Sequence, residues 1–169
     1  MSGLFLLLVV FAWLAAVVLL THWIMKRVSF KPKVVRAVMA LLIFILLLPL
    51  PVVDEIIGGY QYRTLCREKA VLRIDAEKAK GRTVRVVIDP SNEILQGTAI
   101  MIYHSHLSFR DVNTSEEIAS YNRYVAKGGW FIRMLGISGN NAPLTIGLPG
   151  CSPENSGTFP KQYGLKLIN

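Results

Sequence analysis

Two histidines separated by a single residue, His104 and His106, have the spacing of metal ligands. On a β-strand, residues i and i+2 point to the same face, so both imidazoles could bind one Zn²⁺ or Cu²⁺. A zinc site needs at least a third protein ligand. The acidic residues that could supply it are Asp89, Asp111, Glu116 and Glu117, and no spacing favours any of them. We therefore expect two partly exposed histidines on the polar face of a hairpin, and keep a metal-dependent enzyme as one alternative.

A second segment, 136–140, comes close to the Gly-x-Ser-x-Gly pattern of a catalytic serine. It fails because Asn140 occupies the place of the last glycine, so Ser138 is expected to be an ordinary loop residue. The sequence also lacks Gly-x-Gly-x-x-Gly, a P-loop, His-Glu-x-x-His and Cys-x-x-Cys. No cofactor and no small-molecule substrate is indicated, and these observations favour a protein that is not an enzyme.

Aromatic and basic residues are interleaved between residues 121 and 133, which suits the recognition of another protein. Rigid aromatic rings and arginine are enriched at the energetic centres of protein interfaces. The partner-binding candidates are Tyr121, Arg123, Tyr124, Lys127, Trp130 and Arg133. The alternative is that the aromatic rings belong to the core of the domain, as strand aromatics often do.

The candidate residues lie in a part of the chain that has strand patterns. Segments 98–110 and 118–125 predict a hairpin around a polar turn, and 130–135 predicts a third strand after two glycines. We therefore expect an antiparallel meander from about residue 98 to 135. Shorter elements are predicted as strands at 71–75, 83–88 and 144–146 and as a helical turn at 76–81, within a chain that ends in an irregular tail over 136–169.

A helix is predicted over residues 54–70, ahead of these strands. Asp54 can cap its first turn, and Glu55 favours the positive end of its dipole. Gly58-Gly59 predicts a kink between the membrane portion of the chain and the domain. The helix and the strands together predict an α+β domain over 54–169, which is long enough to form its own core.

The two cysteines of the chain, Cys66 and Cys151, both lie in this domain. If the domain is in an oxidising compartment, the simplest interpretation is one disulfide between the helix and the tail. A disulfide that closes a loop of this size stabilises a fold by about 4–5 kcal/mol in the chain-entropy model. The alternative is two unpaired thiols.

The N-terminal third of the chain has a different composition from the rest. All eleven acidic residues lie at or after Asp54, and the five charged residues before it are basic. Residues 3–24 and 37–53 are apolar runs of the length that crosses the ~30 Å hydrocarbon core of a bilayer. With 52% hydrophobic residues, the chain is predicted to be a membrane protein: a transmembrane hairpin over 1–53, followed by the exported domain.

The loop between the two runs, 25–36, carries the charges that set orientation: Lys26, Arg27, Lys31, Lys33 and Arg36. Because cationic loops stay in the cytoplasm, the N-terminus and the domain are expected on the periplasmic side of a bacterial inner membrane. The first run has no basic n-region and is too long for a signal peptide, so we expect it to be retained. The same charges attract anionic lipid headgroups. The remaining net charge, +3 of +8, does not indicate nucleic-acid binding.

These features predict a non-enzymatic protein, anchored in the lipid bilayer, whose exported domain binds a periplasmic or membrane protein. Its most concrete form is an immunity or exclusion protein that protects against an envelope-acting toxin or a phage. Two alternatives stay open. The chain could be a small accessory subunit of a larger membrane complex, such as a secretion, respiratory or transport assembly, or a periplasmic enzyme that uses a metal held by His104 and His106.

Overall fold

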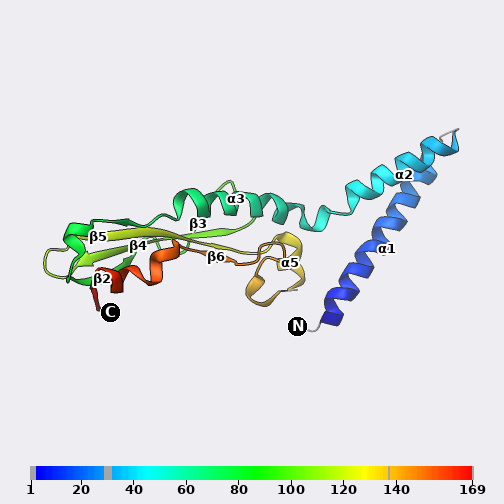
Figure 1. The fold of residues 1–169 in the computed structure, drawn as a ribbon. Coiled ribbons are helices and arrows are strands. Elements are labelled where there is room, and N and C mark those ends of the chain that lie inside the picture. Colours follow the sequence, from blue (N-terminus) through cyan, green and yellow to red (C-terminus); the bar gives the residue numbers. More distant parts are fainter. Residues whose placement is uncertain (1–2, 29–31, 137, 169) are drawn as a thin grey trace.

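The computed structural model describes residues 3–28, 32–136 and 138–168. Lys31 of the basic loop and position 137 of the serine-containing segment lie outside the described residues. The chain is α+β, because two long apolar helices near the N-terminus lead into a domain built around one mixed β-sheet (Figure 1).

The first two helices, α1 (Gly3–Arg27) and α2 (Lys33–Leu47), lie side by side as an antiparallel pair (Figure 1). Val17, Thr21 and Met25 of α1 are buried at intervals of four residues, so one stripe of this helix packs against α2. Most other described side chains of both helices are apolar and exposed, and the described part of α2 has no buried residue. The pair therefore has very little core of its own.

The chain stays helical from α2 into the domain. Only Leu48 and Pro49 separate α2 from the short helix η1 (Leu50–Val52), which leads directly into α3 (Val53–Lys69). Two segments, Leu7–Arg27 and Lys33–Lys69, are long and apolar enough to cross a membrane by length and composition. The first overlaps the predicted apolar run 3–24 and the second contains the run 37–53. Helix α3 confirms the helix predicted over 54–70.

The kink predicted at Gly58-Gly59 is wrong, because α3 continues through both residues. Both glycines are buried, since the domain packs closely against this side of the helix. A Cβ atom on Gly58 would lie 2.5 Å from Cγ1 of Ile100, and one on Gly59 would lie 3.4 Å from Cγ1 of Ile146. The glycines therefore permit close packing of α3 on the domain and do not bend the helix.

A long hairpin of β4 (Ile102–Asp111) and β5 (Glu117–Ala126) forms the centre of the sheet. The strand order is β1-β5-β4-β2-β7, with β3 beside β4 and β6 beside β5. The shorter strands are β1 (Arg73–Ile74), β2 (Thr83–Ile88), β3 (Glu93–Ile94), β6 (Gly150–Cys151) and β7 (Lys166–Ile168). Because β7 runs parallel to β2, the sheet is mixed, and the predicted antiparallel meander holds only for the β4–β5 hairpin.

The third strand predicted for the meander is wrong, because Trp130–Leu135 forms helix α5. Gly129 precedes it in an extended conformation, and the first helical N–H, that of Trp130, donates to the carboxylate of Asp54 at 2.6 Å. A distant side chain thus caps a segment whose apolar residues alone suggested a strand. The remaining short helices are α4 (Ala76–Ala79), η2 (Gly139–Asn141), η3 (Glu154–Gly157) and α6 (Phe159–Gln162).

The two faces of the sheet carry separate cores. Helix α3 covers one face near α2, where Tyr62 packs in a cluster that includes Ile102 and Tyr124. Helix α6 covers the opposite face at the far end, where the ring of Phe159 meets that of Phe109 edge to face with centroids 4.9 Å apart. Figure 1 shows the two helices on opposite sides of the sheet.

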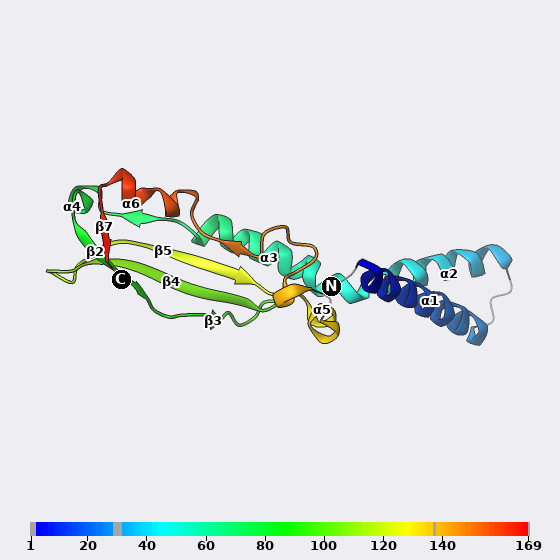
Figure 2. The same ribbon diagram turned by 90° about the horizontal axis from the view of Figure 1, so that it is seen from below.

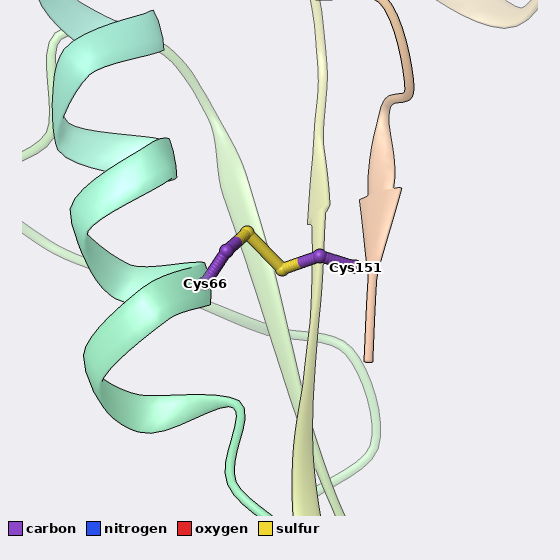
Figure 3. Close-up of a disulfide and its surroundings, with 2 residues drawn as sticks. All are labelled: Cys66 and Cys151. Carbon is purple, nitrogen blue, oxygen red and sulfur yellow. A yellow bond between two sulfur atoms is a disulfide. The ribbon is translucent and has the colours of Figure 1, made fainter. Parts of the chain in front are cut away.

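A disulfide joins α3 to the C-terminal part of the chain, as the cysteine count suggested. The irregular tail predicted over 136–169 is wrong in part, because β6, α6 and β7 lie within it. Cys66 lies in α3 and Cys151 in β6, and their sulfur atoms are 2.03 Å apart (Figure 3). The bond crosses the edge of the first core cluster, where both cysteines pack against buried residues. It therefore fixes α3 over its face of the sheet.

Candidate functional site

His104 and His106 lie on the face of the sheet that α3 covers, and both are half-buried. Each ring is within hydrogen-bond distance of the same atom, Oδ1 of Asn122, at 3.1 Å for His104 and 2.9 Å for His106. The amide nitrogen of Asn122 donates to the carbonyl of Lys69 at the end of α3. Because the amide oxygen only accepts, both histidines donate an N–H to it.

The histidine pair thus shares an asparagine oxygen in the structure. The ring of His104 also stacks on Tyr124, and its Nδ1 lies 4.0 Å from the Glu93 carboxylate. Within the described residues there is no group of three histidines, cysteines or carboxylates that could hold a metal ion. The shared face predicted for the two rings is present, and the asparagine that occupies it is the residue that the sequence analysis missed.

The predicted partner-binding residues do not form one surface. Tyr124 lies beneath α3 with 3% of its surface exposed, and burial raises the pKa of its hydroxyl. Lys127 donates to the carbonyl of Asn140 at 2.9 Å. Trp130 and Arg133 lie on α5, near α1. Tyr121 and Arg123 are therefore the two candidates left on the face of the sheet away from α3.

This opposite face of the β4–β5 hairpin has a middle section that no described helix covers, as Figure 2 shows. The register places Tyr103 beside Val125, Ser105 beside Arg123, and Leu107 beside Tyr121. We call these six residues, with Ile94 of the neighbouring strand β3, the open face. They combine aromatic and aliphatic side chains with one exposed arginine, which is a composition that suits protein recognition.

The electrostatics of the open face centre on Arg123. Burial raises the pKa of the Tyr121 hydroxyl, and the nearby positive charge of Arg123 partly opposes this effect. In the described structure Arg123 has no carboxylate within ion-pair distance, so its charge faces solvent. Ile94 is 43% exposed at the edge of the same face. The arrangement therefore provides a positive charge on a flat, largely apolar surface.

A second unusual site lies where α3 enters the domain. Glu55 has none of its surface exposed, although carboxylates are rarely buried without a partner. Its Oε1 accepts a hydrogen bond from the N–H of Gly129 at 2.9 Å. Its Oε2 accepts from the N–H groups of Leu144 and Thr145, both at 3.1 Å, and from the Thr145 hydroxyl at 3.2 Å. One carboxylate therefore holds two separate loops.

Asp54 lies next to Glu55 in the sequence and holds the same end of the domain together, but not in the way predicted. It was expected to cap α3, but it lies inside that helix and caps α5 through the N–H of Trp130. The strand predicted at 144–146 is also wrong, because Leu144 and Thr145 donate to Glu55 and not to a neighbouring strand. We call Asp54, Glu55 and the loops that they hold the junction. The sequence signal for it is an Asp-Glu pair directly after an apolar run.

Helix α1 also contacts the junction. The Trp13 ring meets that of Phe131 in α5 with centroids 6.2 Å apart, and its Nε1 donates to the carbonyl of Leu48 at 3.2 Å. An apolar cavity of about 210 Å³ lies between α1, η1 and α5, and Val9, Ile132 and other residues line it. Helix α1 is thus packed onto the domain and does not only precede it.

No protein-family model, curated protein or solved structure matches this chain.

Proposed function

We propose that the chain is a membrane-anchored, non-enzymatic protein whose exported domain binds a protein partner through the open face. The observation that carries the proposal is the contrast between the two sides of the β4–β5 hairpin. Helix α3 and a disulfide cover one side, whereas the middle of the other is uncovered and carries Tyr121 and Leu107 beside Arg123. Leu107 and Tyr121 also pack at the edge of the core cluster around Phe109, and the exposed remainder of this face fits another protein surface.

The proposed anchor is formed by α1 and α2. Their exposed side chains are mostly apolar, and the buried stripe on α1 covers only a small part of this surface. The basic residues between residues 26 and 36 favour the cytoplasm for the connecting loop. The domain and the N-terminus then lie on the periplasmic side, where an oxidising environment supports the Cys66–Cys151 disulfide.

The chemistry of the open face defines the kind of partner. The partner would present an apolar patch to Tyr103, Tyr121 and Val125, with a carboxylate opposite Arg123. A toxin or phage protein that acts on the envelope is one form of such a partner. The accessory-subunit alternative has one observation in its favour: no residue of α2 is buried in the described structure, so its outer faces are available to another helix.

Site-specific photo-crosslinking in the cells that make the full-length protein tests this proposal. A photo-reactive amino acid at Leu107, on the open face, should give a crosslinked protein adduct. The same group at Arg67, whose side chain is 80% exposed on α3, serves as the exposed control. Arg123→Glu should abolish the adduct at Leu107, because it reverses the charge that the partner recognises.

Arg85→Glu is the matched control, because Arg85 is exposed on β2 and alternates with Val86 onto the other side of the sheet. It should leave the adduct unchanged. Equal loss with both variants would show a general charge effect and contradict a site on the open face. Adducts that form only from positions in α1 or α2 would support the accessory-subunit function.

A further inference from the structure

We propose that the end of the domain nearest α1 and α2 is seated in the interfacial layer of the bilayer through an apolar collar on α3, α5 and the adjoining loop. This inference rests on the proposed membrane anchor and is independent of the open face. The collar consists of Ile56, Ile57, Tyr60, Trp130, Met134 and Leu144.

The first observation is an abrupt change along the outer side of α3. Ile56 and Ile57 are 54% and 51% exposed, and Tyr60 follows one turn later at 74%. Beyond Tyr60 the exposed side chains are charged, as at Arg67 and Glu68. A helix in water would have polar groups along this whole side. The change at a tyrosine matches the placement of aromatic rings at a membrane interface.

The second observation is the outer side of α5. Trp130 and Met134, one turn apart, are 49% and 65% exposed, whereas Ile132 is fully buried against the domain. Leu144, in the loop that Glu55 holds, is 49% exposed. Helix α5 and the loop that carries Leu144 lie at the same end of the domain as the first turns of α3 (Figure 1). The exposed apolar groups thus occur on both sides of the junction.

The contact between α1 and α5 sets the depth. Trp13 lies ten residues after Gly3, which corresponds to about 15 Å along a helix. Phe131 contacts Trp13, so α5 lies beside the apolar run of α1 and not beyond its end. Helical side chains point back toward the N-terminus, so the ring of Trp13 meets Phe131 on the N-terminal side of its own Cα atom, and this end of α1 lies beside the domain (Figure 1). If α1 crosses the bilayer, α5 therefore lies in the outer half of the lipid layer, on the domain side of Trp13. Interfacial helices bury their apolar face about 5–10 Å into this region.

The junction carboxylates pair the backbone N–H groups of the loops at this end of the domain. Irregular backbone near hydrocarbon is tolerated only when protein groups satisfy its N–H and C=O groups. Asp54 accepts the N–H of Trp130, and Glu55 accepts the N–H groups of Gly129, Leu144 and Thr145. These loop N–H groups are therefore paired within the protein and need no water. A lipid environment explains the buried carboxylates and the exposed apolar residues together.

Tryptophan fluorescence tests the collar, because the full chain has three tryptophans, at positions 13, 23 and 130. In the first protein Trp13→Phe and Trp23→Phe leave Trp130 as the only emitter. In the second, Trp13→Phe and Trp130→Phe leave Trp23, which lies in the second half of α1 and reports insertion. Both are reconstituted in vesicles of phosphatidylcholine and phosphatidylglycerol that contain brominated phosphatidylcholine, with bromine either near the headgroup or near the chain ends.

Trp130 should lose at least as large a fraction of its fluorescence as Trp23, most strongly with bromine near the headgroup, and should be shielded from acrylamide in the water. If Trp130 is unaffected by brominated lipid and open to acrylamide while Trp23 is quenched, the collar is wrong and the anchor stands. If neither tryptophan is quenched, the membrane anchor itself is wrong. An intact Cys66–Cys151 disulfide on a non-reducing gel confirms that each variant is folded.

A second pair of variants checks the boundary on α3 in a chain without other tryptophans. Tyr60→Trp lies at the proposed edge of the lipid, and Arg67→Trp lies about two turns further along the same helix. Brominated lipid should quench the first and leave the second unchanged. Equal quenching at both positions, or at neither, would overturn the proposed boundary.

Discussion

Two buried carboxylates, Glu55 and Asp111, form similar hydrogen bonds at opposite ends of the domain. Glu55 is 0% exposed and Asp111 is 3% exposed, and both accept hydrogen bonds from backbone N–H groups. The partners of Asp111 are local, because its Oδ1 accepts from Asn113 at 2.8 Å and from Thr114 at 3.1 Å. The donors to Glu55 are 74 to 90 residues away in sequence.

The neutralisation of charge also differs between the two sites. Asp111 lies 3.4 Å from Nη1 of Arg82, whereas none of the ion pairs between described residues includes Glu55. The negative charge of Glu55 is stabilised by N–H dipoles and one hydroxyl. The junction is therefore a tertiary structure held together by one side chain, whereas the turn at Asp111 is a local structure that depends little on the rest of the fold.

Removal of the disulfide should have the largest effect on the stability of the domain. Like the junction, the disulfide joins α3 to a segment that is distant in the sequence. The cysteines are 85 residues apart in sequence. The double variant Cys66→Ser, Cys151→Ser should lower the free energy of unfolding by about 4–5 kcal/mol, since the unfolded chain regains the entropy of the open loop. Chemical denaturation in detergent micelles measures it. The oxidised parent treated with dithiothreitol should behave like the variant, and a stability equal to that of the untreated parent would contradict the prediction.

Glu55→Ala should rank second, because it leaves three backbone N–H groups without their partner. The expected loss of stability is about 3–5 kcal/mol, since each buried donor left unpaired costs about 1–3 kcal/mol before the structure relaxes. Hydrogen exchange should accelerate at Gly129 and Leu144, whose N–H groups bond to this carboxylate. Glu68→Ala is the control on the same helix, because that side chain is 57% exposed. Similar stabilities for the two variants would show that the junction is held by other contacts.

Asp111→Asn should have the smallest effect, and the effect should depend on pH. Hydrogen bonds from the N–H groups of Thr114 and Asn113 hold the pKa of Asp111 below its ordinary value of 3.8, and the charge of Arg82 also lowers it. The ionised carboxylate therefore contributes stability above about pH 4, and this contribution is lost as the pH falls through the lower native pKa. The stability of the parent minus that of Asp111→Asn should be positive at pH 7 and should shrink below pH 3.8.

Thermal unfolding of both proteins across this pH range measures the difference. Glu117→Gln, at an exposed position of the same hairpin, is the control and should show no such dependence. A gap between parent and Asp111→Asn that widens as the solution is acidified would reverse the predicted sign.

The features that could be predicted from the sequence are those that local patterns determine. Long apolar runs gave the two long helices, alternation gave β2 and the β4–β5 hairpin, and Gly81 ends the short helical turn with a φ of +68°. The helix over Trp130–Leu135 could not be predicted, because its first N–H is capped by Asp54, which lies 76 positions earlier in the sequence. The same reason applies to 144–146, whose N–H groups bond to Glu55.

Part of the candidate binding surface was already contained in the sequence pattern. Period-two alternation places Tyr121 and Arg123 on one side of a strand and Tyr124 on the other, so the three could not share a surface. The side that would be covered could not be predicted, because it depends on where α3 packs. That position is fixed by Gly58, Gly59 and the Cys66–Cys151 disulfide, which are contacts between distant parts of the chain.

The nearly uninterrupted helical path from α2 through η1 into α3 has a consequence for how a partner would be captured. A domain on a flexible tether can occupy a volume that grows with the length of the tether. The larger this volume is, the lower is the effective concentration of the domain at any one point. Here only Leu48 and Pro49 interrupt the path, and the junction fixes α3 to the loops of the domain that it enters. Because Trp13 of α1 also packs on Phe131 of the domain, the open face would in a membrane be held at one height and one tilt, and would meet partners by lateral diffusion of the whole molecule.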